Sequence, residues 1–342
     1  MARKPSSPSI TIRDVARQAG VSVATVSRYI NETAPVSEPV GNRIQEVLTR
    51  LRYVPHAAAR QLATQKMMAI GLLLNNVYND YFGILLYGIE SVVQNNGYNL
   101  LVATSRPERR KSVLPALGAH NVDGLLVFAD SLGDEDLKAL HAQDLPIVLI
   151  HRSSPKGTKI PSVAVENKAA TFQLVDHLIS KHGRRKILFF RGPVGQVDSH
   201  LREQGYREAL TKHGIKFDPA FILAGDFQRE VAHASMQAFL STHNKGKFDA
   251  IFTGDDSAAI GVMDALEHGG YQVPKDVSVV GFNDSHHAAF LNPPLTTIKA
   301  PTHEVGRIAA KNLFNLINHQ TVEDVTLLPT EIIVRQSCGC AG

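Results

Sequence analysis

The sequence predicts two fold classes in one chain, an all-α helix-turn-helix headpiece followed by a larger α/β core. The length of 342 residues exceeds what one hydrophobic core usually supports. Residues 11–52 hold short apolar stripes with the helical period. From Ala69 onward, short apolar runs alternate with amphipathic segments, which predicts parallel sheets with helices on both faces. The number of these units favours two lobes over one.

Residues 11–31, TIRDVARQAGVSVATVSRYIN, predict two short helices that cross sharply. Gly20 permits the positive φ of the turn, and Ser22 is placed to cap the second helix. Val26 and Tyr29 are expected to face the core of the headpiece. This is the helix-turn-helix pattern, whose second helix enters the major groove of DNA. A surface helical hairpin is the alternative interpretation.

The remaining elements are predicted from apolar runs and helix-period stripes. Buried strands are expected over Ala69–Leu74, Asn99–Thr104, Gly124–Phe128, Pro146–Ile150, Lys186–Arg191, Asp249–Thr253 and Val277–Phe282. Helices are expected over Gly41–Arg52, Tyr81–Asn96, Leu132–Ala142, Lys168–His182, His200–His213, Glu230–Thr242, Asp256–Gly269 and Thr302–His319. Ligands of parallel sheets bind at the carboxyl ends of strands, so a cleft between two lobes is the expected binding site.

These elements divide the chain into a headpiece of residues 1–55, a hinge helix of residues 56–67 and a core of residues 68–342. The hinge segment His56–Gln65 has Leu62 as its only large apolar side chain, so we expect it to become helical only with a second copy and DNA. The N-lobe is expected to comprise about residues 68–165 and 294–325, and the C-lobe about residues 166–293 and 326–342.

The net charge of +4 is unevenly distributed. Residues 1–66 hold ten Lys/Arg against four Asp/Glu, a balance of +6, which leaves −2 for the rest. A basic headpiece would attract phosphate, although solvated basic faces are common. No apolar run follows the N-terminal charges and no window approaches the length of a membrane span, so a cytoplasmic protein without a membrane partner is expected.

No cofactor, metal or catalytic site is predicted. Cys338 and Cys340 are the only cysteines, and a lone C-x-C lacks the second ligand pair of a zinc site, so we expect free thiols in a tail. Asp255 and Asp256 form a carboxylate pair, but the chain shows no Ser/His/Asp constellation at a recognisable spacing.

Along nearly its whole length, the chain resembles the lactose-repressor family of bacterial transcription regulators. The specific matches are TIRDVARQAGVSVATVSRYIN and RLRYVPHAAARQLA; sugar-binding periplasmic proteins share NVDGLLV, LREQGYREAL, DDSAAIG, VPKDVSVVGFND and NPPLTTI more loosely. The resemblance implies a nucleoid-associated repressor whose paired headpieces, in a homodimer, read a near-palindromic operator. It also implies a two-lobed, periplasmic-binding-protein-like core that binds a small-molecule effector.

The resemblance assigns base-edge contacts to Val23 and Ala24, whose apolar side chains favour a thymine methyl group, and a guanine or phosphate contact to Arg28. Other DNA contacts are expected from Thr11, Ser22, Thr25, Ser27 and Asn31, the last four suited to phosphates. Leu62 matches the hinge leucine that wedges into the minor groove, with Ala58 and Ala59 allowing close approach. The alternative is that Leu62 packs on its own domain.

The effector residues implied by the resemblance are Asn79, Tyr81, Phe82, His151, Arg202, Asp255 and Asn283. Aromatic rings stack on sugars, and the Arg202 guanidinium would grip effector oxygens. Asp255, Asn283 and His151 depart from the usual family residues. Seven cationic residues fall in or near predicted cleft loops, which favours a sugar acid or sugar phosphate over a neutral sugar; they are His151, Arg152, Arg191, His200, Arg202, His286 and His287.

Two other functions are weighed against this one. The core alone would suit a solute-binding transport protein, and a phosphorylated partner protein could replace the small effector. Tyr81–Asn96 and Val113–Leu117 are candidates for the dimer interface.

Overall fold

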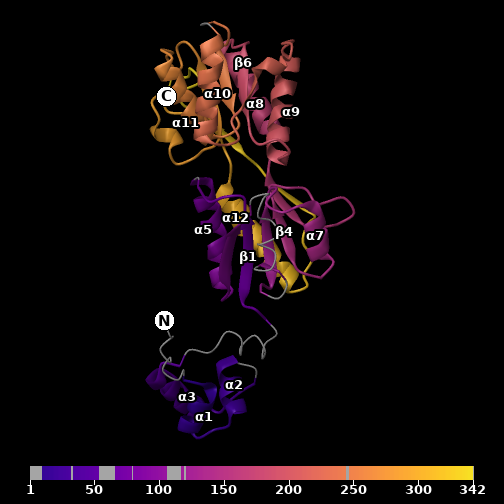
Figure 1. Ribbon diagram of the computed structural model, residues 1–342, viewed down its shortest axis with the longest axis vertical. Helices are drawn as coiled ribbons and strands as arrows, with labels where there is room; N and C mark the ends of the chain where they lie inside the picture. The colour runs from indigo at the N-terminus through magenta and orange to yellow at the C-terminus, as the bar shows by residue number, and fades with distance from the viewer. Residues whose placement is uncertain are drawn as a thin grey trace, which may run out of the picture. The chain divides into compact units, whose positions relative to one another are not determined.

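The computed structural model describes residues 10–31, 34–53, 66–78, 80–105, 117–118, 121–243 and 246–341. The chain divides into two compact units, Met1–Met68 and Ala69–Gly342 (Figure 1). Several predictions fall outside the described residues: the hinge helix with Ala58, Ala59 and Leu62, the pocket residue Asn79, and nearly all of the candidate interface Val113–Leu117.

The first unit holds three helices, α1 (Ile12–Ala19), α2 (Val23–Asn31) and α3 (Glu38–Leu51). Their buried core consists of Val15, Ala16, Ala19, Val26, Ile44 and Val47. Gly20 ends α1 with φ +65°, as predicted for the sharp turn. Helix α3 begins earlier than the predicted Gly41, because Pro39 lies in the first turn, where a missing N–H costs no intrahelical hydrogen bond.

The N-lobe of the second unit is built on a six-stranded sheet in the order β11-β5-β4-β3-β1-β2, in which every pairing is parallel. The strands are β1 (Ala69–Leu74), β2 (Asn99–Thr104), β3 (Gly124–Phe128), β4 (Ile147–Ile150), β5 (Ser162–Val165) and β11 (Val325–Leu328). Its helices are α5 (Asp80–Asn95), α7 (Asp134–His141) and α12 (Thr302–Ile317). Helices α5 and α12 pack against each other (Figure 1).

The C-lobe sheet has the order β12-β10-β9-β8-β6-β7, with an antiparallel pairing between β10 and β12. The strands are β6 (Ile187–Arg191), β7 (Ile222–Ala224), β8 (Ala250–Thr253), β9 (Ser278–Asn283), β10 (Thr296–Lys299) and β12 (Glu331–Ile333). Its helices are α8 (Lys168–His182), α9 (Val197–Lys212), α10 (Arg229–Thr242) and α11 (Asp256–His268), and the short 3-10 turns Pro219–Phe221 and Ala288–Phe290 complete it.

Alternate side chains of β6 pack into two separate hydrophobic clusters. Ile187 and Phe189 join the cluster that contains α8 and α9, whereas Leu188 and Phe190 join the one that contains α10 and α11. Because successive side chains of a strand point to opposite faces, the two helix pairs cover opposite faces of the sheet. This confirms the predicted sheet between two helical layers, although the pairing of β10 with β12 is antiparallel and not parallel as predicted.

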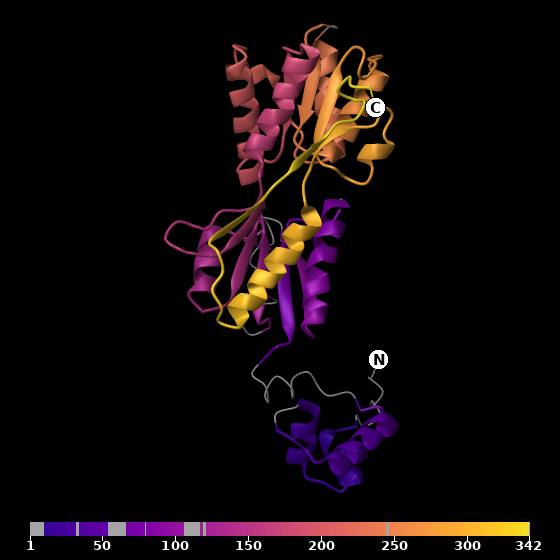
Figure 2. The ribbon, with the colours of Figure 1, turned by 180° about the vertical axis from the view of Figure 1, so that it is seen from behind.

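The chain crosses between the lobes three times: after β5, after β10, and between β11 and β12 (Figures 1 and 2). Two crossings lie at other residues than predicted. The predicted division placed residues 294–299 in the N-lobe and began the last part of the C-lobe at residue 326, within β11. Thr296, Thr297 and Ile298 are buried between β9 and β12, so this short segment belongs to the C-lobe sheet. Strand β11, in turn, pairs with β5 of the N-lobe.

Within the described part of the chain, no helix combines the length and the apolar character needed to cross a membrane.

Candidate functional site

Helix α2 turns one face toward the headpiece core and leaves the other open. Val26 is completely buried, whereas Val23, Ala24 and Arg28 are exposed. Ala24 and Arg28 are four residues apart and therefore lie on the same side of the helix. The apolar side chain of Val23 remains 41% exposed. The predicted base-reading residues thus share an accessible surface.

The other polar residues predicted to contact DNA lie at the start of α1 and along α2. The Thr25 amide donates to Ser22 Oγ at 3.1 Å, which confirms the predicted cap, and Asn31 Nδ2 donates to Ser27 Oγ at 3.2 Å. Thr11 begins α1: its amide and its hydroxyl both donate to Asp14. The hydroxyl bond from Thr11 is the main reason that the pKa of Asp14 lies below its usual range. The bonds of Thr11 and Ser22 thus hold the starts of α1 and α2, and that of Asn31 lies at the end of α2.

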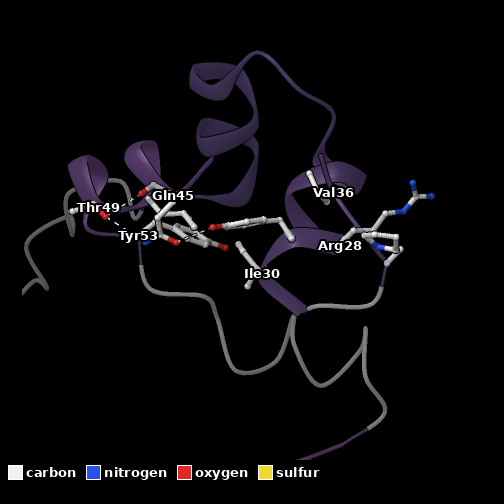
Figure 3. Close-up of a pocket in the computed structure, with 10 residues that line it drawn as sticks. Arg28, Ile30, Val36, Gln45, Thr49 and Tyr53 are labelled. Atoms are coloured by element: carbon white, nitrogen blue, oxygen red, sulfur yellow. Dashed lines mark hydrogen bonds between the residues drawn. The ribbon is translucent and has the colours of Figure 1, made fainter. Parts of the chain in front are cut away.

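Two polar contacts hold α3 against the other helices. The Tyr29 hydroxyl donates to Gln45 Oε1 at 3.2 Å, and Arg50 donates to Gln18 of α1 at 2.9 Å. A groove of about 690 Å³ lies between α2 and α3. Figure 3 shows Gln45, Thr49 and Tyr53 gathered at one end of it, while the Arg28 guanidinium extends away from the helices. Tyr29 is half-buried and packs against the core, as expected.

A second candidate site is a cavity of about 810 Å³ between the two lobes of the core. It lies where strands of both sheets end, because Phe128, Asn283 and the residues after β1, β4 and β8 line it. All the predicted effector residues that the structure describes line this cavity: Tyr81, Phe82, His151, Arg202, Asp255 and Asn283. The parallel-sheet rule therefore located the cavity correctly.

Arg202 of α9 is the buried cation of this cavity. Its Nε donates to Asn167 Oδ1 at 2.8 Å, and its Nη1 donates to the Gly254 carbonyl oxygen. The guanidinium carbon lies 3.5 Å from the centroid of the Phe282 ring. Burial lowers the pKa of Arg202, while the neighbouring Asp198 opposes that shift. The side chain is thus held in one orientation from three sides.

Asp198, one turn before Arg202, connects this cation to the opposite lobe. Its carboxylate lies 2.8 Å from His151 Nδ1 and 3.8 Å from Arg202 Nη2, and it accepts a hydrogen bond from Asn167. His151 Nε2 in turn lies 2.5 Å from the Tyr81 hydroxyl. Burial raises the pKa of Asp198, but His151 and its other partners leave it below the usual value. This network links α9 of one lobe to α5 of the other.

The two carboxylates at the start of α11 have different partners. Asp255 caps the helix by accepting from the Ala258 amide at 2.8 Å, and burial raises its pKa to about 6. Asp256 accepts from Thr297 Oγ1 and from the Ser285 amide, both at 2.6 Å, and burial raises its pKa to about 7. Both groups therefore have structural partners inside the C-lobe.

Most of the residues behind the predicted cationic pocket do not line this cavity. Of the seven cationic residues, only His151 and Arg202 line the cavity among the residues described, and both lie beside Asp198. Arg152 instead donates to two carbonyl oxygens and pairs with Asp134. The described lining holds three residues that can be cationic, with Arg229 as the third, and a larger set of acidic residues: Asp130, Asp198, Asp226, Glu230 and Asp255. A position near a strand end does not fix the direction in which a long side chain points.

Sequence reasoning missed several residues that shape the cavity. Asp198 and Asn167 complete the network around Arg202, and Phe227 and Phe282 supply ring faces near its guanidinium. Only Asp198 carried a usable signal, because an acid four residues before an arginine lies on the same side of a helix.

Comparison with known proteins gives matches over nearly the whole chain. The family model described as "Bacterial regulatory proteins, lacI family" matches residues 11–56, and "Periplasmic binding protein-like domain" matches residues 175–338. The transcriptional regulator RegA of Clostridium saccharobutylicum is 33% identical over 331 residues, which cover 96% of this chain and 98% of that protein. Catabolite control protein A of Priestia megaterium is 31% identical over 333 residues, which cover 96% and 99%.

Two solved structures extend the likeness to the fold. The lac repressor dimer bound to operator and the anti-inducer ONPF has a TM-score of 0.85 at 28% identity, covering 96% of this chain and 99% of that one. The transcriptional regulator CelR in complex with cellobiose has a TM-score of 0.72 at 28% identity, with the same coverage.

Proposed function

We infer the function from the premise that this chain belongs to the lacI family of bacterial regulatory proteins. The protein is a DNA-binding transcription regulator, and its mode of action is repression. We propose that a small effector bound between the core lobes controls this repression. The observation that carries the proposal is the presence, in one chain, of an exposed α2 surface and a polar cavity between two lobes.

For DNA, the proposed reading surface is the exposed side of α2 with Val23, Ala24 and Arg28. Support comes from the fixed start of each helix and from the basic balance of residues 1–66. Two headpieces of a homodimer would read the two halves of a near-palindromic operator. The solved lac repressor is a dimer bound to operator, which favours the same assembly here. Exposed apolar side chains on the N-lobe offer material for a dimer interface: Ile84, Tyr87, Leu101 and Val102.

For the effector, we propose a neutral sugar. The guanidinium carbon of Arg202 lies 3.5 Å from the centroid of the Phe282 ring, and the group has N–H donors beyond those used by Asn167 and Gly254. Such a planar group can bind hydroxyl oxygens in a forked arrangement. The acidic lining accepts hydrogen bonds from sugar hydroxyls but repels a carboxylate or a phosphate. The solved CelR complex with cellobiose adds support, since cellobiose is an uncharged sugar.

The proposed control is a change in the arrangement of the lobes. An effector that contacts both lobes favours one arrangement over another, and this difference in affinity is what couples the cavity to DNA binding. Described contacts that already bridge the lobes are His151 with Asp198, Gln196 with Asp130, and His287 with Asp80.

A titration of the full chain tests this proposal. The protein should bind duplexes selected from a random library with an affinity that falls steeply as the salt concentration rises. One neutral sugar should change this DNA affinity by roughly 5- to 150-fold. Arg202→Lys, which keeps the charge but loses the planar fork, should abolish the response to sugar. Arg207→Lys, on the same helix but paired with Glu203, is the matched control.

Each outcome has a separate meaning. No salt-dependent preference for any duplex would overturn the DNA-binding part. A response to a sugar acid or sugar phosphate but to no neutral sugar would overturn the effector class. A response only to a phosphorylated partner protein would replace the small effector.

We also propose that the chain has no catalytic role, since Asp255 and Asp256 are occupied as a helix cap and as an acceptor for Thr297 and Ser285. A regulator of this kind would act in the cytoplasm, at the nucleoid. Fluorescence microscopy of a tagged protein together with stained DNA checks the location.

A further inference from the structure

Two histidines and two cysteines meet on the C-lobe, away from the cavity lining. His177 and His182 lie in the last turns of α8, and Cys338 and Cys340 lie in the tail that follows β12. One ligand atom from each residue lies within 4.8 Å of the other three. The sequence predicted free thiols because no second ligand pair stands near C-x-C; the fold brings that pair from 163 residues away.

The distances match a tetrahedral metal site. His177 Nε2 lies 3.3 Å from His182 Nε2, and Cys340 Sγ lies 3.7 Å and 3.4 Å from these two nitrogens. Around tetrahedral Zn²⁺, bond lengths of about 2.05 Å to nitrogen and about 2.3 Å to sulfur separate two nitrogens by about 3.3 Å and a nitrogen from a sulfur by about 3.6 Å. The three atoms therefore already have the spacing that a bound ion would require.

The tail that carries both thiols is fixed in place by hydrogen bonds. Ser278 Oγ donates to the Cys338 carbonyl oxygen at 2.6 Å, and the Val279 amide donates to the Ser337 carbonyl oxygen at 2.9 Å. Gly339 separates the cysteines with φ +108°, and a Cβ there would lie 3.2 Å from His182 Nδ1. Only glycine adopts this backbone easily while leaving room for the ring. Cys338 is fully buried and the other three residues are half-buried.

We propose that His177, His182, Cys338 and Cys340 bind one divalent metal ion of the zinc class. Two thiols and two imidazoles in a tetrahedral arrangement select Zn²⁺ over Mg²⁺ and Ca²⁺, which take oxygen ligands. On binding, each Sγ–H loses its proton to solvent and forms an S–metal bond, while each imidazole donates a nitrogen lone pair. Two thiolate charges then neutralise the ion. With four protein ligands the site is closed, which marks it as structural.

The structural consequence concerns the end of the chain. The tail comes from β11 of the N-lobe through β12, so a metal would join the last crossing between the lobes to helix α8 of the C-lobe. Because the ion binds the folded chain, it stabilises that state.

Cobalt titration of the full-length, reduced protein tests the proposal. Co²⁺ should bind with one equivalent that shows thiolate-to-metal charge transfer and the visible bands of tetrahedral Co²⁺, and Zn²⁺ should displace it. Cys340→Ser leaves the Cys338 thiolate as the one sulfur ligand, so it should weaken the charge-transfer band of bound Co²⁺ and lower the affinity by more than the roughly 10- to 100-fold loss typical of an outer-shell partner. His182→Gln, which keeps both thiols, should weaken binding by a similar factor.

A second cluster on the protein provides the matched control. His233, Asp264 and His268 also lie together but contain no sulfur, so His268→Ala should leave the charge-transfer band unchanged. Zn²⁺ should raise the Tm of the wild type and of His268→Ala, but not that of Cys340→Ser. Circular dichroism checks that each variant is folded. Absence of the charge-transfer band in the wild type, or a band intensity and a Co²⁺ affinity that are unchanged in both Cys340→Ser and His182→Gln, would overturn the site and leave only thiol–imidazole hydrogen bonds.

Discussion

Asp256 shows how a single buried carboxyl makes stability depend on pH. Its pKa is about 7 in the folded protein, against 3.8 for an ordinary Asp. As pH rises between these values, the unfolded chain releases the proton while the folded chain keeps it, so stability falls through this window and stays lower above it. Asp256→Asn keeps the shape of the side chain but cannot ionise. The new amide group can donate to Thr297 Oγ1, and its oxygen can accept from the Ser285 amide.

We therefore expect Asp256→Asn to flatten the fall in Tm between pH 4 and pH 7, with a gain at pH 8 of roughly 1–3 kcal/mol. Differential scanning calorimetry across this range measures it. Glu323→Gln, at an exposed carboxyl, should leave the curve unchanged. If the two variants show the same pH dependence, Asp256 is ionised in the fold.

Arg28 is the exposed cation on the proposed reading side of α2. If it binds a phosphate, Arg28→Ala should weaken binding to all duplexes alike and reduce the slope of log K against log salt by about 1. If it reads a guanine, the loss should instead fall on one operator position, at about 1–3 kcal/mol. Anisotropy titrations over a salt series distinguish the two. Lys138→Ala, on core helix α7, should change neither quantity.

At the scale of elements, helices α5 and α12 touch through their backbones. A Cβ on Gly88 would clash with the His303 carbonyl oxygen at 2.1 Å. Because both groups belong to helix backbones, the clash is relieved only if the two helices move apart. Gly88→Ala should therefore destabilise the core by about 1–3 kcal/mol. Gly83→Ala on the same helix meets nothing within 4 Å and should instead stabilise it by roughly 0.5–1 kcal/mol. Urea unfolding of both variants checks the opposite signs.

The elements that the sequence predicted best are the long ones. Helix Lys168–His182 and strand Ala69–Leu74 have the predicted bounds, because their apolar patterns are long and end at clear signals such as Gly183. Strands β5, β7, β10 and β11 were missed because they have three or four residues each, and β10 reads TTIK without an apolar run. Whether such a short segment forms a strand depends on the neighbouring strands with which it pairs.

Contacts within the candidate sites, too, were predictable only where the residues are close in the sequence. Residues on one helix, such as Asp198 and Arg202, are linked by spacing alone. In contrast, His177 and Cys340 are brought together only by the packing of β12 and the tail against α8. Spacing in the sequence holds no signal for such a contact, so four potential ligands were read as an isolated C-x-C.

For the whole molecule, the contact between His151 and Asp198 is the buried bridge between the lobes, whereas the contacts of Gln196 with Asp130 and of His287 with Asp80 are more exposed. Asp198→Asn removes the charge that faces His151 and Arg202, and a buried arginine without its counter-charge is strongly unfavourable. We expect the lobes to separate more often. The Glu166 amide, which donates to the Leu328 carbonyl oxygen at the crossing, should then exchange its hydrogen faster. The effect of sugar on DNA affinity should also change. Glu203→Gln, which removes a same-helix ion pair, should change neither. Unaltered exchange at the crossing in Asp198→Asn would mean that this contact only positions Arg202.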